Sequence, residues 1–174
     1  MMFPSKEIVE KLKKEYPKGT RVQLVAMDDF QNDFVLAQIA GKSINLAMDI
    51  PGGVISRKSA SAIKMLTGRD LVTINAKNEH PYKYRNFAKL VFASNDPITT
   101  KESDSAFWER MIIIPFLNSI PKKEQDSELL DKFWEERDGI VNQAVFFARE
   151  LLKNGFQFPG CPVAEVMKRN WISG

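Results

Sequence analysis

Two polar residues, Asp49 and Asn95, each follow a short apolar run that the sequence predicts to be a buried strand, at residues 44–48 and 90–94. In open α/β sheets, ligands bind beyond the carboxyl ends of the strands, so parallel strands would bring both side chains to one crevice. A carboxylate there can hold Mg²⁺, and an amide can orient an attacking water near a terminal phosphate. The pair favours a nucleoside triphosphatase site, but Asp and Asn also end strands in proteins of every kind.

Arg110 stands directly before a third apolar run, residues 111–116, which is rich in isoleucine and short enough to be a strand. In the same parallel sheet, Arg110 would lie at the amino-terminal edge, opposite the crevice. From there its guanidinium could reach the site of a neighbouring subunit and neutralise charge on a phosphoryl group. The alternative is an arginine at a helix end, paired with Glu109 or Asp104.

The segment from residue 69 to residue 89 is locally basic, with five cations against two acids, and it also carries aromatic rings. The cations are Arg69, Lys77, Lys83, Arg85 and Lys89, and His80, Tyr82 and Tyr84 are interleaved with them. Closed as a hairpin, this segment could track a phosphate backbone and stack on bases, as proteins that hold single strands do. The alternative is a solvated hairpin with ordinary surface lysines.

The tripeptide Gly41-Lys42-Ser43 is predicted to be a turn and not a phosphate-binding loop. A P-loop needs glycine where Leu36 stands, and it follows a strand and opens a helix. Here the order is reversed, because the tripeptide follows a predicted helix and precedes a predicted strand.

Composition excludes several classes of site. The chain has 174 residues and a net charge of +3, which is too small to indicate nucleic-acid binding by itself. One cysteine, Cys161, and one histidine, His80, cannot supply a disulfide framework or a structural zinc site. No apolar run is long enough for a signal peptide or a membrane span, so we expect a cytoplasmic protein without a membrane partner.

Alternating apolar runs and turns predict an α/β sheet domain followed by helices, with a boundary near Pro121 that gives domains 1–120 and 121–174. The predicted helices are residues 6–16, 28–39, 58–66 and 138–153, and a further strand is predicted at 71–75.

In this order, the segments resemble a known family. Residues 64–116 contain a lysine, Leu-Thr-Gly, a basic hairpin, an apolar strand ending in Asn95, and an arginine before an Ile-x-Phe-like run. This pattern resembles the core of superfamily 3 helicases of the phage and plasmid primase and poxvirus primase-helicase group. Residues 34–53 resemble the family's Walker B segment, and residues 138–159 resemble its helical segment after the core.

The resemblance implies an AAA+-like P-loop NTPase core that binds ATP and Mg²⁺ and assembles as a hexameric ring on single-stranded DNA. Asp49 would be the Walker B carboxylate that holds Mg²⁺, Asn95 the sensor, and Arg110 the finger acting in trans. Lys77, His80 and Lys83 would belong to the DNA-gripping hairpin, which Tyr82 and Arg85 extend. Arg69 replaces a glycine that is common in the family.

The sequence departs from the family's pattern at its start. The predicted helix at residues 6–16 corresponds to the helix that follows the P-loop in the family, and no P-loop pattern precedes it. We therefore expect a truncated or split helicase gene product with weak or no ATP binding. The missing first strand would leave a bare sheet edge, which favours self-association or a partner, such as a P-loop-bearing fragment or a primase domain. A stand-alone single-stranded-DNA-binding or ring-interacting module without catalysis is the alternative, and an inactive relic is a third.

Overall fold

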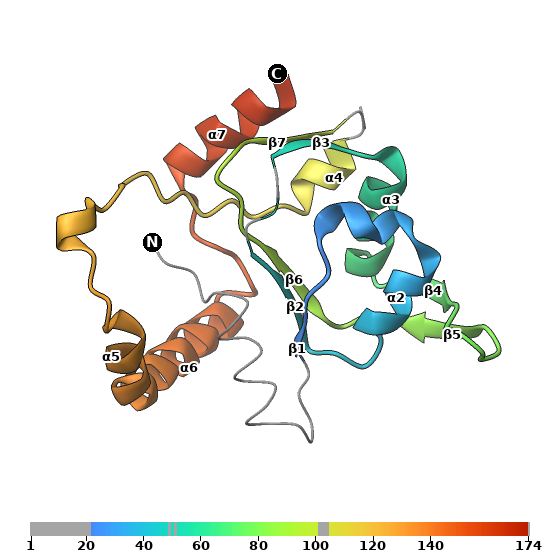
Figure 1. Ribbon diagram of the computed structural model, residues 1–174, viewed down its shortest axis with the longest axis horizontal. Coiled ribbons are helices and arrows are strands. Elements are labelled where there is room, and N and C mark those ends of the chain that lie inside the picture. Colours follow the sequence, from blue (N-terminus) through green and yellow to red (C-terminus); the bar gives the residue numbers. More distant parts are fainter. Residues whose placement is uncertain (1–21, 49, 51, 101–104, 174) are drawn as a thin grey trace. The chain divides into compact units, whose positions relative to one another are not determined.

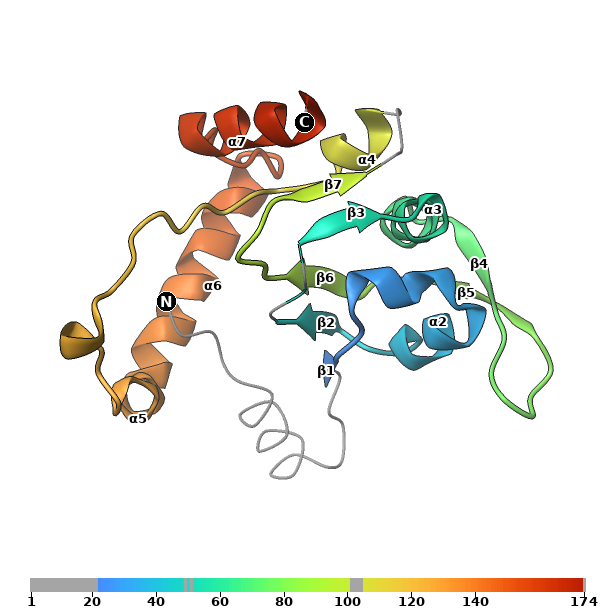
Figure 2. The same ribbon diagram turned by 45° about the horizontal axis from the view of Figure 1, so that its top comes forward.

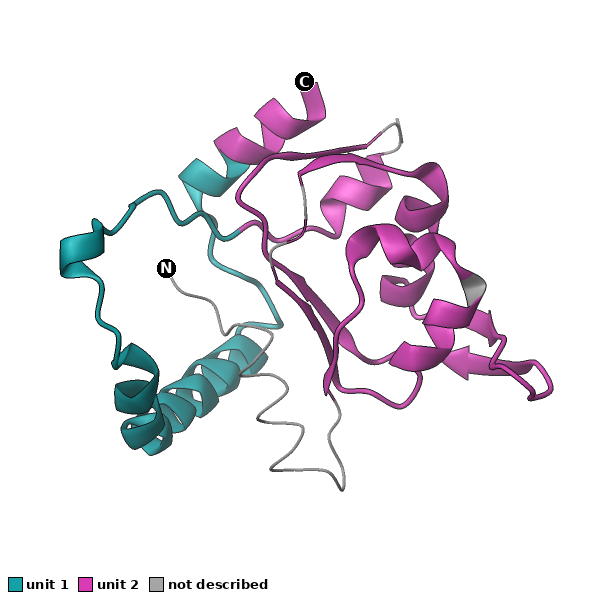
Figure 3. Cartoon of the chain, viewed as in Figure 1, with its two compact units in different colours: residues 1, 114–165 teal, residues 2–113, 166–174 magenta. Residues whose placement is uncertain are grey.

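The computed structural model describes residues 22–48, 50, 52–100 and 105–173, and the chain divides into two compact units (Figure 3). The first, which we call the sheet unit, consists of residues 2–113 and 166–174. The second, the helical unit, consists of residues 114–165. The chain is of the mixed α/β class, as predicted, and the units divide after residues 113 and 165, whereas the sequence placed a boundary near Pro121.

The described residues of the sheet unit form three short sheets (Figure 1). The largest is parallel, with strands in the order β1, β2, β6, and its members are β1 (Val22–Gln23), β2 (Ile44–Ala47) and β6 (Lys89–Phe92). A second parallel pair joins β3 (Gly53–Ile55) to β7 (Ile98–Thr100), and an antiparallel pair joins β4 (Leu71–Ile74) to β5 (Tyr82–Arg85). The strands predicted around residues 44–48, 71–75 and 90–94 are confirmed.

The two parallel pairs share one register. Ile44 pairs with Lys89 and Gly53 pairs with Ile98, so in both pairs the partner lies 45 positions further along the chain (44 to 89, 53 to 98). β2 with β6, and β3 with β7, are therefore two stretches of one parallel ribbon with a break between them (Figure 2). The strand ladder stops after the pair Ala47 with Phe92, and Asn95, one of the residues predicted to bind nucleotide, lies in this interruption.

Several helices contribute side chains to the core of the sheet unit or pack against it. They are η1 (Met27–Gln31), α2 (Asp33–Ile39), α3 (Arg57–Thr67) and α4 (Ser105–Glu109), with most of α7 (Pro162–Ser173). α3 begins where Ser56 accepts a hydrogen bond from the Ser59 amide, which satisfies a donor of the first turn, and it ends at Gly68. The predicted helix at residues 28–39 is divided at Asn32, whose side chain caps α2 by accepting from the Phe34 amide.

The core of the sheet unit is continuous and mostly apolar. Its most deeply buried large side chains include Phe30, Ile39, Ile63, Ile74 and Phe107. Burial of this apolar surface is the main force that holds α3 and α4 on the strands, at about 25 cal/mol per Å² removed from water. The edge-to-face pair of Trp108 and Trp171, with centroids 6.4 Å apart, joins α7 to this core.

The helical unit is different, because its helices bury few of their apolar side chains. It contains η2 (Lys122–Glu124), α5 (Leu129–Glu135), α6 (Arg137–Lys153) and the first turn of α7. No residue of α5 or α6 is buried, although Phe133, Trp134 and Phe147 are large and apolar. Asp126, which precedes α5, accepts a hydrogen bond from the Lys132 ammonium of that helix at 2.6 Å. This bond, together with one from the Glu128 amide, lowers the pKa of the Asp126 carboxyl below its ordinary value.

Two predictions about elements have other outcomes. The strand predicted at residues 111–116 is wrong, because these residues belong to no helix or strand. A strand needs a neighbour for its backbone groups, and no described strand pairs with this run. The helix predicted at residues 6–16 lies outside the described residues.

Candidate functional site

The carboxyl ends of β2 and β6 lie at one edge, because the two strands are parallel neighbours. Asn95 follows β6 by three residues and is exposed there. Asp49 follows β2 in the sequence but lies outside the described residues, so its predicted place beside Asn95 stays a prediction. The structure does supply the parallel strands on which that prediction depends.

A local turn shapes the chain around Asn95. The Ser94 hydroxyl donates to the Asp96 carbonyl at 2.8 Å and accepts from the Asp96 amide at 3.2 Å, so the two residues that flank Asn95 are joined. Directly before β3, a Cβ added at Gly52 would lie 2.1 Å from the Asp96 Cβ. Neither Ser94 nor Gly52 was predicted from the sequence to shape this site, although a serine two residues before an aspartate is a recognisable turn pattern.

Replacing Gly52 by alanine is expected to displace the Ser94–Asp96 turn, because the new methyl group and Asp96 cannot occupy the same space. We expect a loss of about 1–3 kcal/mol in the free energy of unfolding and shifted amide resonances for residues 94–97. Gly139→Ala is the matched control, since a Cβ there meets nothing within 4 Å. Unchanged resonances at the turn in Gly52→Ala would contradict this account of the break.

Arg110 lies at the end of α4, and it is exposed. Its guanidinium donates from Nη1 to the Ala106 carbonyl of the same helix. Glu109, one of its two predicted partners, accepts instead from the Ser105 hydroxyl at 2.8 Å, and the other, Asp104, lies outside the described residues. Arg110 was predicted to lie at the opposite edge of the sheet because a strand was expected directly after it, and no strand follows it. Its proposed role in the site of a neighbouring subunit is therefore supported only by its exposure.

The predicted basic hairpin is confirmed as an antiparallel pair, and it projects from the sheet unit in Figures 1 and 2. Its turn is closed by a hydrogen bond from the Glu79 amide to the Ala76 carbonyl, with Asn78 in the left-handed region at φ 66°. Asparagine tolerates that conformation better than most residues. Lys77 and His80 lie in this tip and are exposed, so both are open to a ligand.

The two strands of the hairpin separate cations from aromatic rings. Thr73 pairs with Lys83, and Leu71 pairs with Arg85, so these four residues share one face, and all are exposed. The other face carries Val72 and Ile74, which are buried, opposite Tyr84 and Tyr82 respectively. The Lys83 ammonium donates to the Thr73 hydroxyl at 2.9 Å, which holds it on the solvent face.

The aromatic face fixes the root of the hairpin. The Tyr84 hydroxyl accepts from the Gly41 amide at 2.9 Å, and the Tyr84 ring packs against the core. Tyr82 is 42% exposed, so its ring remains accessible for stacking. At the root, the buried Asn86 donates to the carbonyls of Leu66 and Ala88, which joins α3 to the chain entering β6.

Residues Gly41-Lys42-Ser43 form the predicted turn between α2 and β2, with Gly41 at φ 74°. The Lys42 amide donates to the Ile39 carbonyl and the Gly41 amide donates to Tyr84, so these amides do not converge on a phosphate. This turn therefore does not provide the phosphate cradle that ATP needs. Among them, no three His, Cys, Asp or Glu side chains gather to hold a metal ion, and Asp49, the predicted Mg²⁺ ligand, lies outside them.

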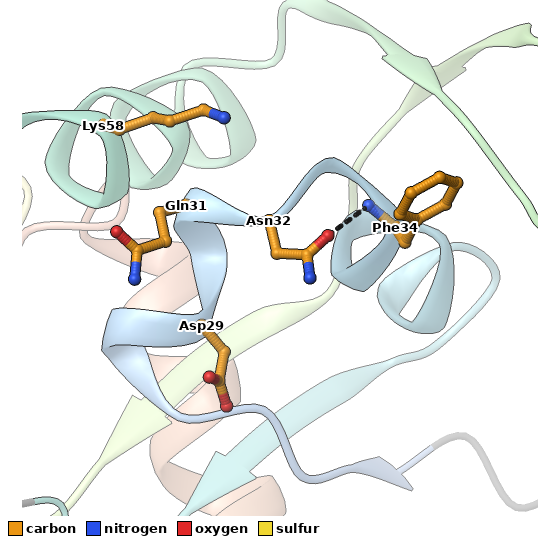
Figure 4. Close-up of a pocket in the computed structure, with 5 residues that line it drawn as sticks. All are labelled: Asp29, Gln31, Asn32, Phe34 and Lys58. Atoms are coloured by element: carbon orange, nitrogen blue, oxygen red, sulfur yellow. Dashed lines mark hydrogen bonds between the residues drawn. The ribbon is translucent and has the colours of Figure 1, made fainter.

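An open pocket of about 460 Å³ lies beside η1, α2 and the start of α3 (Figure 4). It is lined by Asp29, Gln31, Asn32, Phe34 and Lys58. All five residues are exposed, and the hydrogen bond drawn between Asn32 and Phe34 is the cap of α2. The pocket is thus the solvated surface of a helix start, and none of the residues predicted from the sequence to bind nucleotide or DNA lines it.

The structure defines a mixed α/β protein with a broken parallel ribbon and a projecting cationic hairpin. The chain belongs to the DUF5906 family, a family of unknown function, whose model matches residues 6–110. The match spans the ribbon, the hairpin and Arg110. No curated protein matches the sequence.

Proposed function

We propose that this chain is part of a superfamily 3 replicative DNA helicase of the phage, plasmid or viral type, and that its direct activity is to hold single-stranded DNA. The observation that carries the proposal is the projecting hairpin, whose solvent face presents Lys83 and Arg85 beside the exposed Lys77 of the tip. A cationic ridge of this kind suits a phosphate backbone, which carries charge at every nucleotide.

The break in the parallel ribbon supports the wider helicase assignment. In that family an acid and an amide follow neighbouring parallel strands, and here β2 and β6 are such neighbours, followed by Asp49 and Asn95. In this proposal Asp49 would hold Mg²⁺, Asn95 would orient water, and the exposed Arg110 would serve a neighbouring subunit of a hexameric ring in the host cytoplasm. A P-loop-bearing fragment would have to supply the phosphate cradle, and a primase domain is a further expected partner. Among the described residues, no helix could span a bilayer.

The isolated chain is not expected to hydrolyse ATP, because backbone amides and a lysine that cradle the phosphates are needed for tight binding. Release of inorganic phosphate by purified protein should equal that of buffer, with Mg²⁺ and with or without single-stranded DNA. Magnesium-dependent turnover that Asp49→Ala abolishes would show that the site is complete without a P-loop.

A second function, a stand-alone single-stranded-DNA-binding or ring-interacting module without catalysis, is favoured by one observation. The amides of the Gly41 turn are directed to Ile39 and Tyr84 and not to a ligand, while the hairpin is intact. The two functions make the same prediction for DNA and differ for ATP. Addition of a P-loop-bearing fragment encoded beside the gene would restore ATP hydrolysis only if the chain is part of a helicase, and not if it is a stand-alone module.

The proposal is tested by fluorescence anisotropy with a labelled single-stranded oligonucleotide and a duplex of the same length. We expect binding to the single strand that weakens as salt increases, because each phosphate contact releases counterions. Absence of binding at low salt, or binding that does not respond to salt, would remove the basis for both functions.

A further inference from the structure

Phe87 is an aromatic residue at the surface of the sheet unit, between the end of β5 and the start of β6. It is 55% exposed, although its neighbours in the sequence, Asn86 and Ala88, are both buried. A single exposed ring is common at protein surfaces and by itself indicates no ligand. Phe87 is distinguished by the way in which its backbone and its ring are held, and by the charges beside it.

The backbone on both sides of Phe87 is fixed by the side chain of Asn86. The Asn86 Oδ1 accepts from the Ala88 amide at 3.2 Å, and its Nδ2 donates to the Ala88 carbonyl at 3.1 Å. The same Nδ2 donates to the carbonyl of Leu66, in the last turn of α3, at 3.1 Å. Phe87, which lies between the two bonded residues, is therefore held at the surface by a short loop that is anchored to a helix.

The Phe87 ring is supported by a second ring. Its centroid lies 6.1 Å from that of Tyr84, with an angle of 52° between the two planes. Tyr84 packs against the core and accepts from the Gly41 amide, so this support is itself fixed. A side chain that is already ordered loses little conformational entropy when a ligand binds to it. The exposed part of Phe87 therefore suits a flat, apolar ligand.

Two exposed cations flank Phe87 along the chain. Arg85 precedes it by two residues and Lys89 follows it by two. Because consecutive Cα atoms are about 3.8 Å apart, the Cα atom of each cation lies within about 7.6 Å of the Phe87 Cα atom. No Asp or Glu occurs between residues 80 and 95. The surroundings thus favour a ligand that joins a flat ring to an anion, as a nucleotide does.

We propose that Phe87 forms a stacking site for one unpaired base of single-stranded DNA, with Arg85 and Lys89 placed for the adjoining phosphates. The site rests on the proposed function and extends the binding surface from the tip of the hairpin to its root. A base inside a duplex has both faces covered by its neighbours, so only an unpaired base can stack on Phe87. Phosphate contacts occur with either kind of DNA, and Phe87 therefore gives the preference for the single strand.

The first test compares two single strands of equal length by anisotropy. One consists of thymidine nucleotides, and the other lacks the bases but retains every phosphate. Phe87→Ala should weaken binding of the thymidine strand by about tenfold, because stacking needs a base. Its affinity for the abasic strand and its salt slope should equal those of the wild type, since stacking releases no counterion. Phe34→Ala, which removes another exposed phenylalanine of the sheet unit, at 60%, is the matched control and should change neither affinity.

The possible outcomes separate this inference from the proposed function. A wild type that binds neither strand overturns both. Salt-dependent binding in which Phe87→Ala and the wild type have the same affinities overturns the stacking site alone. An equal loss of affinity for the two strands in Phe87→Ala also overturns the stacking site, because it would show that the ring supports the hairpin and does not contact a base.

The second test replaces the ring and keeps the position filled. Phe87→Trp should bind the thymidine strand as tightly as the wild type, and the strand should quench more of its emission than that of the wild type, which has three tryptophans. Phe34→Trp should show no additional quenching. Phe87→Leu, which keeps an apolar side chain beside Tyr84 but no aromatic face, should bind the thymidine strand as weakly as Phe87→Ala. A leucine variant with wild-type affinity, or a Phe87→Trp variant without additional quenching, would overturn the proposal.

Discussion

Replacing Lys83 and Arg85 together by alanine should weaken the binding of single-stranded DNA by at least about tenfold at low salt, because two phosphate contacts are lost. The slope of log affinity against log salt should fall in magnitude by about 1.4, at roughly 0.7 for each contact with a single strand. Both side chains are exposed on the same face of the hairpin, so the fold should be unaffected. The measurement is an anisotropy titration at several salt concentrations.

Lys122→Ala with Lys123→Ala is the matched control for that result. It removes the same charge from exposed positions in η2, and it should change the affinity and the salt slope little. A second comparison is Tyr82→Ala, which should lower the affinity without a change in slope if its exposed ring stacks on a base. If the control pair and the hairpin pair weaken binding equally, then only net charge is involved and the hairpin is not the interface.

The position of the hairpin could be predicted from the sequence, but the arrangement of its side chains on the two faces could not. The sequence showed cations and rings interleaved along the segment, as in Tyr82, Lys83, Tyr84, Arg85, but not how they divide between the two faces of the hairpin. Alternation in the strand places the rings opposite Ile74 and Val72 and the cations opposite Thr73 and Leu71. The expected mode of binding is therefore mainly electrostatic, and Tyr84 serves to anchor the hairpin at Gly41.

The strands β2 and β6, whose carboxyl ends border the candidate site, could be predicted from sequence because they are short apolar runs followed by turn-forming residues, as at Asn95. Their common register could not, since it depends on which strands become neighbours. The run at residues 111–116 is as apolar as the true strands, and it failed as a prediction because strand formation requires a partner and no described strand pairs with it. The composition of a segment gives its tendency to form a strand, and the presence of a pairing partner decides whether the strand forms.

Asn45 is the residue whose importance the sequence least disclosed, because it stands in the middle of a run that is otherwise apolar. It is fully buried in β2, where its Oδ1 accepts from the Val25 amide and its Nδ2 donates to the Val25 carbonyl, both at 2.9 Å. Val25 lies between β1 and η1, where its backbone has no strand partner. The carboxamide supplies both bonds that a neighbouring strand would otherwise provide.

Asn45→Ala should therefore lower the free energy of unfolding by about 3 kcal/mol, since it leaves a buried donor and a buried acceptor unsatisfied and also opens a cavity. Urea unfolding followed by tryptophan fluorescence measures this as a lower midpoint, and Trp108 and Trp171 report on the sheet unit. Gln31→Ala, an exposed substitution in the same unit, should change the free energy of unfolding by less than about 0.5 kcal/mol. Asn45→Leu distinguishes the two contributions, because it restores volume without restoring the bonds. A leucine variant as stable as the wild type would mean that packing, and not the paired hydrogen bonds to Val25, holds β2 against the start of η1.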